Sequence, residues 1–401
     1  MENESSTIPF GKIMVITFVC DVLGEENNGT TIATMNVAKA MAAKGHEVRF
    51  VCCDSYRQGE LGYYIVPEMR FGPFNHYVHS NGVHPASGRD LSSVKEALEG
   101  TDVVHFNFCG ALSKKVVKLA HEMGIPCTAS MHTQAENFTN HVYLDKTRFA
   151  NKIMYSFLWN GLFKKVDAIH YPSQFIKDFL EKHEHFSNKA YVISNGIQNA
   201  FKRIEIERPK EWQDKIVIAY TARYSREKAH KELVKAMAYS KHKEDLILVL
   251  PGAGPDKMNR KIQKWCKKWC YNPPVLGFHS REEMVEILNC TDIYCHVGRV
   301  DIEPVSALEA ISIGVAPVLT DSPVSAVSSF ALSEHNLYHH GDSKSLAKAI
   351  DYWIEHPEER KKNADSYAGF ADQFAFEKSM GKMEAMWQEV IADYKEKHPK
   401  Q

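Results

Sequence analysis

One stretch decides the fold, and it reads R-V-D-I-E-P-V-S-A-L-E-A-I-S-I-G-V-A-P-V-L-T-D-S-P-V-S-A, from Arg299 to Ala326. The apolar run just before it, 292–297, predicts a buried strand, and Val315–Thr320 predicts the next one. Between them a loop leads into a short helix that Gly314 ends. Strand, loop, helix and strand form the unit of a parallel α/β sheet, which binds ligands at the carboxyl ends of its strands.

Three carboxylates lie in that loop and helix: Asp301, Glu303 and Glu309. For any one of them alone, a charged surface loop is the simplest interpretation. Three of them this close together, with Pro304 and Ser306 in between, favour a ligand with many hydroxyl groups, because each carboxylate accepts several hydrogen bonds. We therefore expect a polyhydroxylated ligand here.

The same alternation of apolar runs and helical stripes extends over the whole chain. Runs such as Lys12–Cys20 are typical of strands buried on both faces of a parallel sheet. The pattern stops in a polar stretch near residues 200–212 and then restarts. Two α/β halves of similar size predict two Rossmann-like domains that face each other across a cleft. We place the boundaries at 1–205 for the first domain, 206–375 for the second, and 376–401 for a C-terminal helix whose Met/Trp stripe needs a partner surface.

Composition excludes several classes of protein. The 401 residues include 49 basic and 50 acidic ones, so no nucleic-acid partner is indicated. Nine cysteines without a CxxC pair favour a reducing cytosol, and Cys266 and Cys270 lack a second pair at zinc spacing, so we expect no metal site. The acidic N-terminus does not fit a signal peptide, and Glu2 does not fit N-myristoylation. No apolar run is long enough to span a membrane, so we expect a protein that is soluble or at most peripheral.

Two helical segments suit either a core or a membrane surface. Asn151–Val166 is apolar and aromatic with flanking lysines, and a buried core helix is the preferred interpretation. Residues 256–270 interleave lysines with tryptophans, and a solvated basic face is preferred there over contact with anionic lipid. Residues 55–95 show little periodicity and predict an irregular excursion, which either covers an acceptor or packs as an ordinary long loop.

Candidate binding residues follow the predicted strands. Gly29 lies in a turn before a helix N-terminus that can face an anion. His132 falls at the carboxyl end of a strand, where both a structural histidine and a ligand contact fit. Arg223 and Lys228 lie in a loop at the sheet edge that also carries residues 301–309. Two cations that can neutralise a diphosphate, beside carboxylates that bind hydroxyls, indicate a nucleotide-sugar site.

The chain has no Asp-x-Asp pair, the metal-chelating motif of metal-dependent sugar transferases. Side-chain cations and backbone amides are therefore expected to replace a metal. Glu309, near the N-terminus of its helix, is expected to be stabilised as an anion by the helix dipole.

In their order along the chain, these motifs resemble those of the GT-B-fold retaining glycosyltransferases of family four. N-N-G-T-T-I-A-T-M-N-V-A-K-A-M-A-A-K-G-H-E-V resembles the family's opening glycine loop and helix. The family order continues with G-I-P-C-T-A-S-M-H, V-I-S-N-G-I, T-A-R-Y-S-R-E-K and A-L-E-A-I-S-I-G-V-A-P-V. The resemblance covers nearly the whole chain and implies two Rossmann-like domains, with the C-terminal helix crossing back to the first.

The resemblance also implies catalytic positions. Arg223 and Lys228 would bind the donor diphosphate, and His132 would contact the donor sugar. The family's first glutamate lies eight residues before its second. That place is held here by Asp301, with Glu303 two residues on, so either of the two could meet the sugar.

Other positions would bind the donor without taking part in the chemistry. Gly29 would approach the diphosphate through its backbone, and Glu309 would hold the ribose hydroxyls. Glu303, Val305 and Ser306, in the same loop and helix, are grouped with them.

A narrower similarity, to bacterial glycolipid synthases that glucosylate diacylglycerol, rests on M-H-T-Q-A-E-N-F, D-I-E-P-V-S-A-L-E-A-I and D-S-P-V-S-A-V-S-S-F-A-L-S-E. It implies a retaining, metal-independent transferase that moves a hexose, glucose from UDP-glucose, onto a diacylglycerol-type lipid. No cofactor beyond the nucleotide-sugar donor is expected. The protein would be cytoplasmic and peripheral at the inner face of the cell membrane, in contact with its anionic surface. Transfer to a soluble acceptor and sugar-nucleotide epimerisation on the same scaffold are the alternatives.

Overall fold

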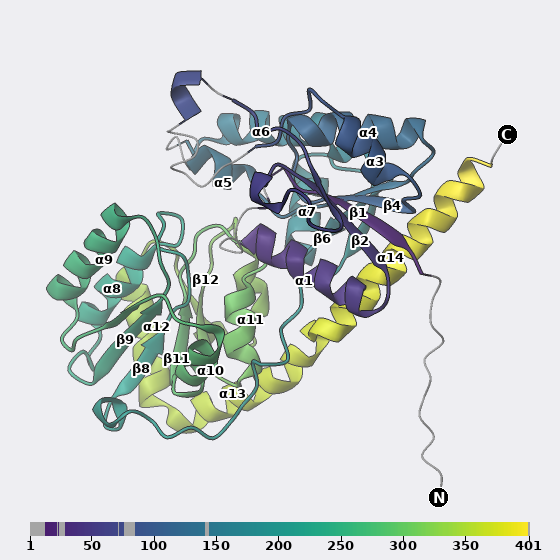
Figure 1. Cartoon of the computed structure of the whole chain (residues 1–401). Coiled ribbons are helices and arrows are strands. Elements are labelled where there is room, and N and C mark those ends of the chain that lie inside the picture. The colour runs from purple at the N-terminus through teal and green to yellow at the C-terminus, as the bar shows by residue number, and fades with distance from the viewer. Residues whose placement is uncertain are drawn as a thin grey trace, which may run out of the picture.

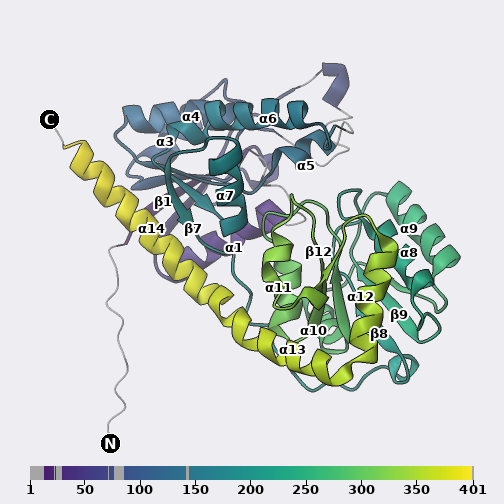
Figure 2. The same ribbon diagram turned by 180° about the vertical axis from the view of Figure 1, so that it is seen from behind.

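A computed structural model describes residues 13–21, 23, 29–70, 72–75, 85–140 and 144–399. It consists of two α/β lobes joined by a long C-terminal helix (Figure 1). The same two lobes and the helix that joins them are seen from behind in Figure 2.

The first lobe is built on a seven-stranded parallel sheet in the order β3-β2-β1-β4-β5-β6-β7. Its central strands are buried along almost their whole length, as their continuous apolar sequences predict. The strands are β1 (Val15–Val19), β2 (Glu47–Cys52), β3 (Tyr63–Ile65), β4 (Val103–Phe106), β5 (Cys127–Ser130), β6 (Ala168–Tyr171) and β7 (Lys189–Val192). The helices are α1 (Gly29–Ala43), α3 (Ser92–Leu98), α4 (Ala111–Glu122), α5 (Ala135–Asn140), α6 (Arg148–Gly161) and α7 (Gln174–His183).

The second lobe repeats the design with a six-stranded parallel sheet in the order β10-β9-β8-β11-β12-β13. Its strands are β8 (Ile216–Ala219), β9 (Leu246–Pro251), β10 (Val275–Gly277), β11 (Ile293–His296), β12 (Ala316–Thr320) and β13 (Leu337–Tyr338). Its helices are α8 (His230–Tyr239), α9 (Asp256–Trp269), α10 (Arg281–Asn289), α11 (Val305–Ser312), α12 (Ser343–Glu355) and α13 (Pro357–Ala371). Gly314 follows α11 with φ +81°, a conformation that glycine adopts without strain, so it ends the helix as predicted.

The last helix, α14 (Phe376–Lys397), crosses back to the first lobe. In Figures 1 and 2 it runs from the second lobe along the first. Its Met and Trp side chains, with Trp387 fully buried, belong to the same apolar cluster as residues of β1 and α1. The indole N–H of Trp387 donates to Thr128 Oγ1 at 3.1 Å. The predicted fold, two Rossmann-like domains with a returning helix, is therefore confirmed.

Three aspartates stand at the starts of strands and bind the neighbouring strand. Asp102 accepts from the N–H of Val15 at 2.9 Å, and Asp167 accepts from that of Cys127 at 2.7 Å. Asp292 does the same in the second lobe. Asp167 also contacts His121 at 3.1 Å. His121, Cys127 and Asp167 each have an atom that could bind a metal, and these atoms lie within 4.8 Å of one another. Because Asp167 already binds His121 and the backbone of Cys127, we interpret this group as part of the strand pairing.

Several short elements differ from the sequence prediction. β3 lies within the segment 55–95 that was expected to be irregular; residues 71 and 76–84 of that segment lie outside the described residues. α5 lies in the polar run after His132. A three-residue strand and a six-residue helix are too short to show periodicity, so they depend on tertiary contacts.

Candidate active site

A buried ion-pair cluster lies where β8 and β11 end side by side. Lys228, in the loop before α8, places its Nζ 2.5 Å from Oδ1 of Asp301, in the loop after β11. The other carboxylate oxygen of Asp301 lies 2.8 Å from Nε2 of His296. The Lys228 and Asp301 side chains are only 17% and 13% exposed. The cluster leaves no room for a side chain at Gly298, where a Cβ would come within 2.6 Å of Asp301 Oδ2.

The charges of this cluster follow from its partners. Burial by itself raises the pKa of Asp301, but Lys228 and His296 outweigh it and hold the pKa well below its usual range. Burial lowers the pKa of His296 despite Asp301 beside it. At neutral pH, Asp301 is therefore an anion that accepts a hydrogen bond from neutral His296 and pairs with Lys228.

Glu303, two residues on, binds the other lobe. Its Oε2 accepts from both the backbone N–H and the side-chain amide of Asn195, at 2.8 and 2.7 Å. Its Oε1 has no hydrogen-bond partner among the described residues. Burial raises the pKa of Glu303 to about 7, although hydrogen bonds from Ser194 and Asn195 oppose it. Between the two carboxylates, Ile302 packs into the apolar cluster of the first lobe.

The helix after this loop carries the remaining predicted donor-binding residues. Val305 begins α11 with its N–H bonded to the carbonyl of Glu303. The hydroxyl of Ser306 lies 3.1 Å from that of Tyr294. Burial raises the pKa of Glu309 to about 8, and the charge of Arg281 opposes this rise. The helix dipole was expected to stabilise Glu309 as an anion, and burial acts in the opposite direction.

The other predicted residues are spread around these loops. His132 follows β5, with its ring edge-on to that of His170 at 6.0 Å, and burial lowers its pKa to about 3, so the imidazole is neutral. Arg223 lies exposed in the loop that also holds Lys228. Gly29 is the first residue of α1, and a Cβ there would meet nothing within 4 Å.

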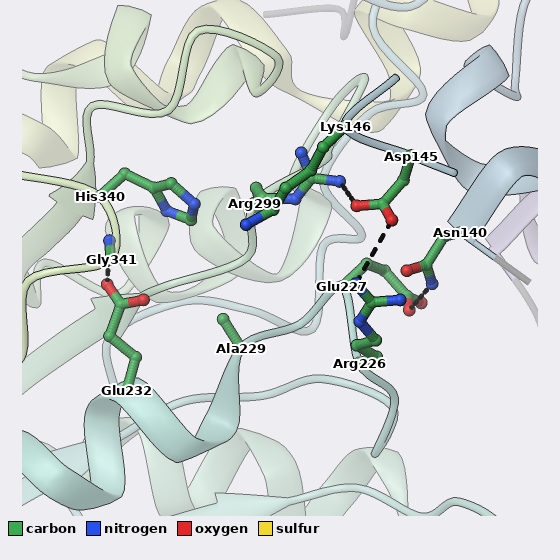
Figure 3. Close-up of a pocket in the computed structure, with 10 residues that line it drawn as sticks. All are labelled: Asn140, Asp145, Lys146, Arg226, Glu227, Ala229, Glu232, Arg299, His340 and Gly341. Atoms are coloured by element: carbon green, nitrogen blue, oxygen red, sulfur yellow. Dashed lines mark hydrogen bonds and ion pairs between the residues drawn. The ribbon is translucent and has the colours of Figure 1, made fainter. Parts of the chain in front are cut away.

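A pocket of about 220 Å³ opens between the two lobes (Figure 3). On one side of it Asp145, from the first lobe, is bound by Arg299 and lies 3.5 Å from Arg226, both from the second lobe. Nearby, the side-chain amide of Asn140 donates to Glu227 at 3.0 Å. The lining residues come from both lobes: Asn140, Asp145, Lys146, Arg226, Glu227, Ala229, Glu232, Arg299, His340 and Gly341.

Sequence reasoning gave none of these pocket residues a role. Arg226 and Glu227 lie beside Lys228, and Arg299 opens the stretch that decides the fold, so adjacency was a usable signal. Asp145 gave no such signal, because its partners lie about 80 and 150 residues further along the chain.

The profile of Glycosyltransferase Family 4 matches residues 27–201, and that of Glycosyl transferases group 1 matches residues 202–368. The chain belongs to the glycosyltransferases of family four. The alpha-monoglucosyldiacylglycerol synthase of Streptococcus pneumoniae is 25% identical in a match of 233 residues that covers 55% of this chain. In this match the chain spans about half, 52%, of that relative's length.

Two solved structures share the fold of this glycosyltransferase. Sucrose-phosphate synthase from Thermosynechococcus elongatus superposes with a TM-score of 0.71 at 14% identity, covering 95% of this chain and 100% of that one. Anabaena Alr3699/HepE in complex with UDP-glucose gives 0.69 at 13% identity, covering 94% and 100%. The glycosyltransferase therefore has the GT-B fold.

In this glycosyltransferase the loops after β8 and β11 bring a cation, a carboxylate and a neutral imidazole together next to the other lobe. Such a group can neutralise an anionic leaving group and accept hydrogen bonds from hydroxyls without a base of its own. Glycosyl transfer requires both abilities at one place.

Proposed function

We propose that the protein transfers a hexose, glucose from UDP-glucose, onto a diacylglycerol-type lipid at the inner face of the cell membrane, with retention at the anomeric carbon and without a metal. The observation that carries this is the Lys228–Asp301–His296 cluster at adjacent strand ends. The named relative, a monoglucosyldiacylglycerol synthase, and the UDP-glucose complex of a structural neighbour support the acceptor and the donor. Residues 1–205 would take the acceptor, residues 206–375 the donor, and residues 376–401 would tie the two together.

Binding of the donor would change the partner of Lys228. In the structure the Nζ of Lys228 forms an ion pair with Oδ1 of Asp301 at 2.5 Å. A diphosphate held by Arg223 and by the N-terminal end of α1 at Gly29 would compete for Lys228. Asp301, still held by His296, would then accept hydrogen bonds from the sugar hydroxyls. This exchange makes Asp301, rather than Glu303, the carboxylate that meets the sugar.

Transfer would follow by front-side attack. The bond between the anomeric carbon and the diphosphate oxygen breaks, and the acceptor oxygen bonds to that carbon on the same face. The acceptor's proton passes to the departing diphosphate oxygen, so no protein base is needed. Arg223 and Lys228 stabilise the charge that grows on the diphosphate. Neutral His132 donates a hydrogen bond to the sugar, whose position it fixes.

The donor nucleoside would be bound by the second lobe. Glu309 would accept hydrogen bonds from the ribose hydroxyls, and its raised pKa favours a protonated or hydroxyl-bound carboxyl over a bare anion. Val305 and Ser306, in the first turn of α11, would present the helix N-terminus to the phosphate next to the ribose.

The experiment that tests this is incubation with a panel of UDP- and GDP-hexoses and a lipid extract, followed by mass spectrometry of the products. We expect a hexosyl-diacylglycerol from UDP-glucose and no product without an acceptor. Glycosylation of a water-soluble acceptor in place of lipid would refute the proposed acceptor. Conversion of the donor without any acceptor would show an epimerase instead.

A further inference from the structure

The helix α6 presents a continuous apolar stripe to solvent. Phe149, Ile153 and Phe157 recur every four residues, so they lie on one face of the helix. They are 74%, 55% and 48% exposed, whereas Asn151 and Tyr155 on the opposite face are buried. Exposed apolar side chains that gather in one place mark a contact with another molecule or a membrane.

Basic side chains accompany this stripe along the chain. The basic side chains between residues 144 and 165 are all exposed: Lys146, Arg148, Lys152, Lys164 and Lys165. The one acidic residue of that segment, Asp145, is buried against arginines of the other lobe. From α4, Lys114 adds an ammonium group 3.6 Å from the centre of the Phe157 ring. Basic side chains therefore outnumber acidic ones in this segment, although Glu184 lies close enough to Lys152 to interact with its charge.

A groove of about 500 Å³ continues the surface along α4, which lies beside α6 in both views of the molecule (Figures 1 and 2). Three lysines line it, Lys114, Lys118 and Lys165, together with Val117, His121 and Glu122. Glu122 lies 3.7 Å from Lys118, so two of the three lysines are left without an acidic partner in this lining. In contact with a bilayer, lysines of this kind would bind negatively charged lipid headgroups, and the apolar side chains would contact the hydrocarbon below them.

The other basic helix, α9, lacks the apolar half of such a surface. Its large apolar side chains, including Trp265 and Trp269, are partly or fully buried against the core of the second lobe. Its lysines therefore form a solvated face, as the sequence favoured. Among the described residues, no helix is both long and apolar enough to cross a bilayer.

We propose that the outer face of α6, with Phe149, Ile153 and Phe157 inserted between headgroups and the surrounding lysines on anionic lipid, is the surface on which this protein docks to a bilayer. The positive charge of the face complements an anionic membrane and does not suit a second copy of the same face. The proposal rests on the proposed function, since a lipid acceptor must be taken from the bilayer.

The position of α6 suits delivery of that acceptor. On the buried side of α6, the hydroxyl of Tyr155 donates to Glu136 of α5 at 2.6 Å. The helix α5 begins three residues after His132, at the carboxyl end of β5. Docking through α6 thus brings the bilayer within one helix layer of the candidate active site.

The test is co-sedimentation of the full chain with vesicles of phosphatidylcholine containing about one third phosphatidylglycerol, and with phosphatidylcholine alone. We expect binding to the anionic vesicles that weakens with salt. Phe149→Ser with Phe157→Ser should lower the affinity at least about tenfold, because two aromatic rings lose their burial. Lys152→Ser, Lys164→Ser and Lys165→Ser together should lower it about tenfold to a hundredfold.

Two control variants match these changes. Lys261→Ser, Lys264→Ser and Lys267→Ser remove the same charge from α9, and Leu61→Ser removes a fully exposed apolar side chain elsewhere in the first lobe. Both should bind the vesicles like the unchanged protein. Equal losses in the α6 and α9 variants would overturn the proposal, since charge alone would then explain binding. So would light scattering that shows a dimer of the unchanged protein and a monomer of the α6 variants, with equal vesicle binding.

Donor turnover separates this proposal from the proposed function. With the acceptor dispersed in detergent micelles, the α6 variants should turn over UDP-glucose like the unchanged protein, and lose turnover only on vesicles. Turnover lost equally in micelles and on vesicles would refute α6 as a docking surface. If no lipid product forms under any condition, the proposed function fails, while sedimentation still decides whether α6 binds anionic lipid.

Discussion

At the scale of single residues, Asp301 and Glu303 show how two neighbouring carboxylates acquire opposite properties. Asp301 faces Lys228 and His296, which hold its pKa low despite burial. Glu303 faces Asn195 in a buried place without a cation, and its pKa rises to about 7. At neutral pH the first is fully charged and the second is partly protonated. The sequence left open which of the two meets the donor sugar, and their surroundings favour Asp301 in that role.

Lys228→Ala is expected to lower kcat by about a hundredfold or more, because it removes a fixed cation from the leaving group and leaves Asp301 unpaired. Arg223→Ala should act in the same direction. Initial rates of UDP release with a saturating acceptor measure both. Lys231→Ala, an exposed lysine three residues further along, is the matched control and should keep its rate. Near-normal rates in both Arg223→Ala and Lys228→Ala would show that the donor diphosphate binds elsewhere.

Glu303 makes stability depend on pH. Its pKa is about 7 in the folded protein against an ordinary value of 4.5, so between these values the folded state binds more protons than the unfolded one. This contribution to the free energy of unfolding is fully present below pH 4.5 and is lost as pH rises through 7. Glu303→Gln cannot ionise, so its free energy of unfolding should depend less on pH. Compared with the unchanged protein, its free energy of unfolding should rise by on the order of 1 kcal/mol or more between pH 5 and pH 8.

Urea unfolding at pH 5 and pH 8 measures this difference. Glu286→Gln, an exposed residue of α10, is the control and should not alter the pH profile. A Glu303→Gln protein that is destabilised by the same amount at both pH values would mean that Glu303 is already ionised at pH 5.

At the scale of elements, the pattern predicts which segments become helices but not which face each one buries. The segment 151–166 was expected to be a core helix, yet α6 buries one side and exposes Phe149, Ile153 and Phe157 on the other. The stripe of α14 was expected to need a partner, and the first lobe supplies it. Both stripes are apolar, so only the neighbouring elements distinguish a buried one from an exposed one.

Trp387→Ala in α14 is expected to lower the free energy of unfolding by about 3–5 kcal/mol, because a fully buried indole and its hydrogen bond to Thr128 are lost. Thermal and urea unfolding measure the change. Gln388→Ala, on the exposed side of the same helix, should change the stability by less than about 0.5 kcal/mol. If Trp387→Ala unfolds like Gln388→Ala, α14 does not pack on the first lobe in solution.

At the scale of the whole molecule, the loops of the second lobe that carry Lys228 and Asp301 are held by the first lobe. Arg226 and Arg299, which flank Lys228 and Asp301 in the chain, both reach Asp145. Ile302 packs into the first lobe, and its carbonyl accepts a hydrogen bond from Ser173 at 2.5 Å. The arrangement of the lobes thus helps to set the geometry of the ion-pair cluster.

Asp145→Asn removes the common partner of the two arginines and is expected to lower the free energy of unfolding by about 1–3 kcal/mol, less than for a deeply buried pair because Arg226 is half-exposed. We also expect a lower kcat with little change in the donor KM, since the lobes lose their alignment but the loops that carry Lys228 and Asp301 stay intact. Unfolding curves and steady-state kinetics measure these effects.

Glu384→Gln is the control for Asp145→Asn, because it breaks an ion pair with Lys44, which follows α1, away from the pocket between the lobes. It should affect stability but leave kcat unchanged. Equal kcat in the two variants would show that Asp145 does not align the lobes.

The sequence by itself determined the longer strands and helices, the two-lobed α/β fold and the loops that carry Arg223, Lys228 and Asp301. These features are local: buried parallel strands are continuous apolar runs, and the loops that follow them share one sheet edge. The tertiary structure decided which carboxylate pairs with Lys228, how Asp145 links the lobes, and which face of α6 is exposed. Each of these depends on packing between segments that are distant in the chain, and local sequence patterns do not predict such packing.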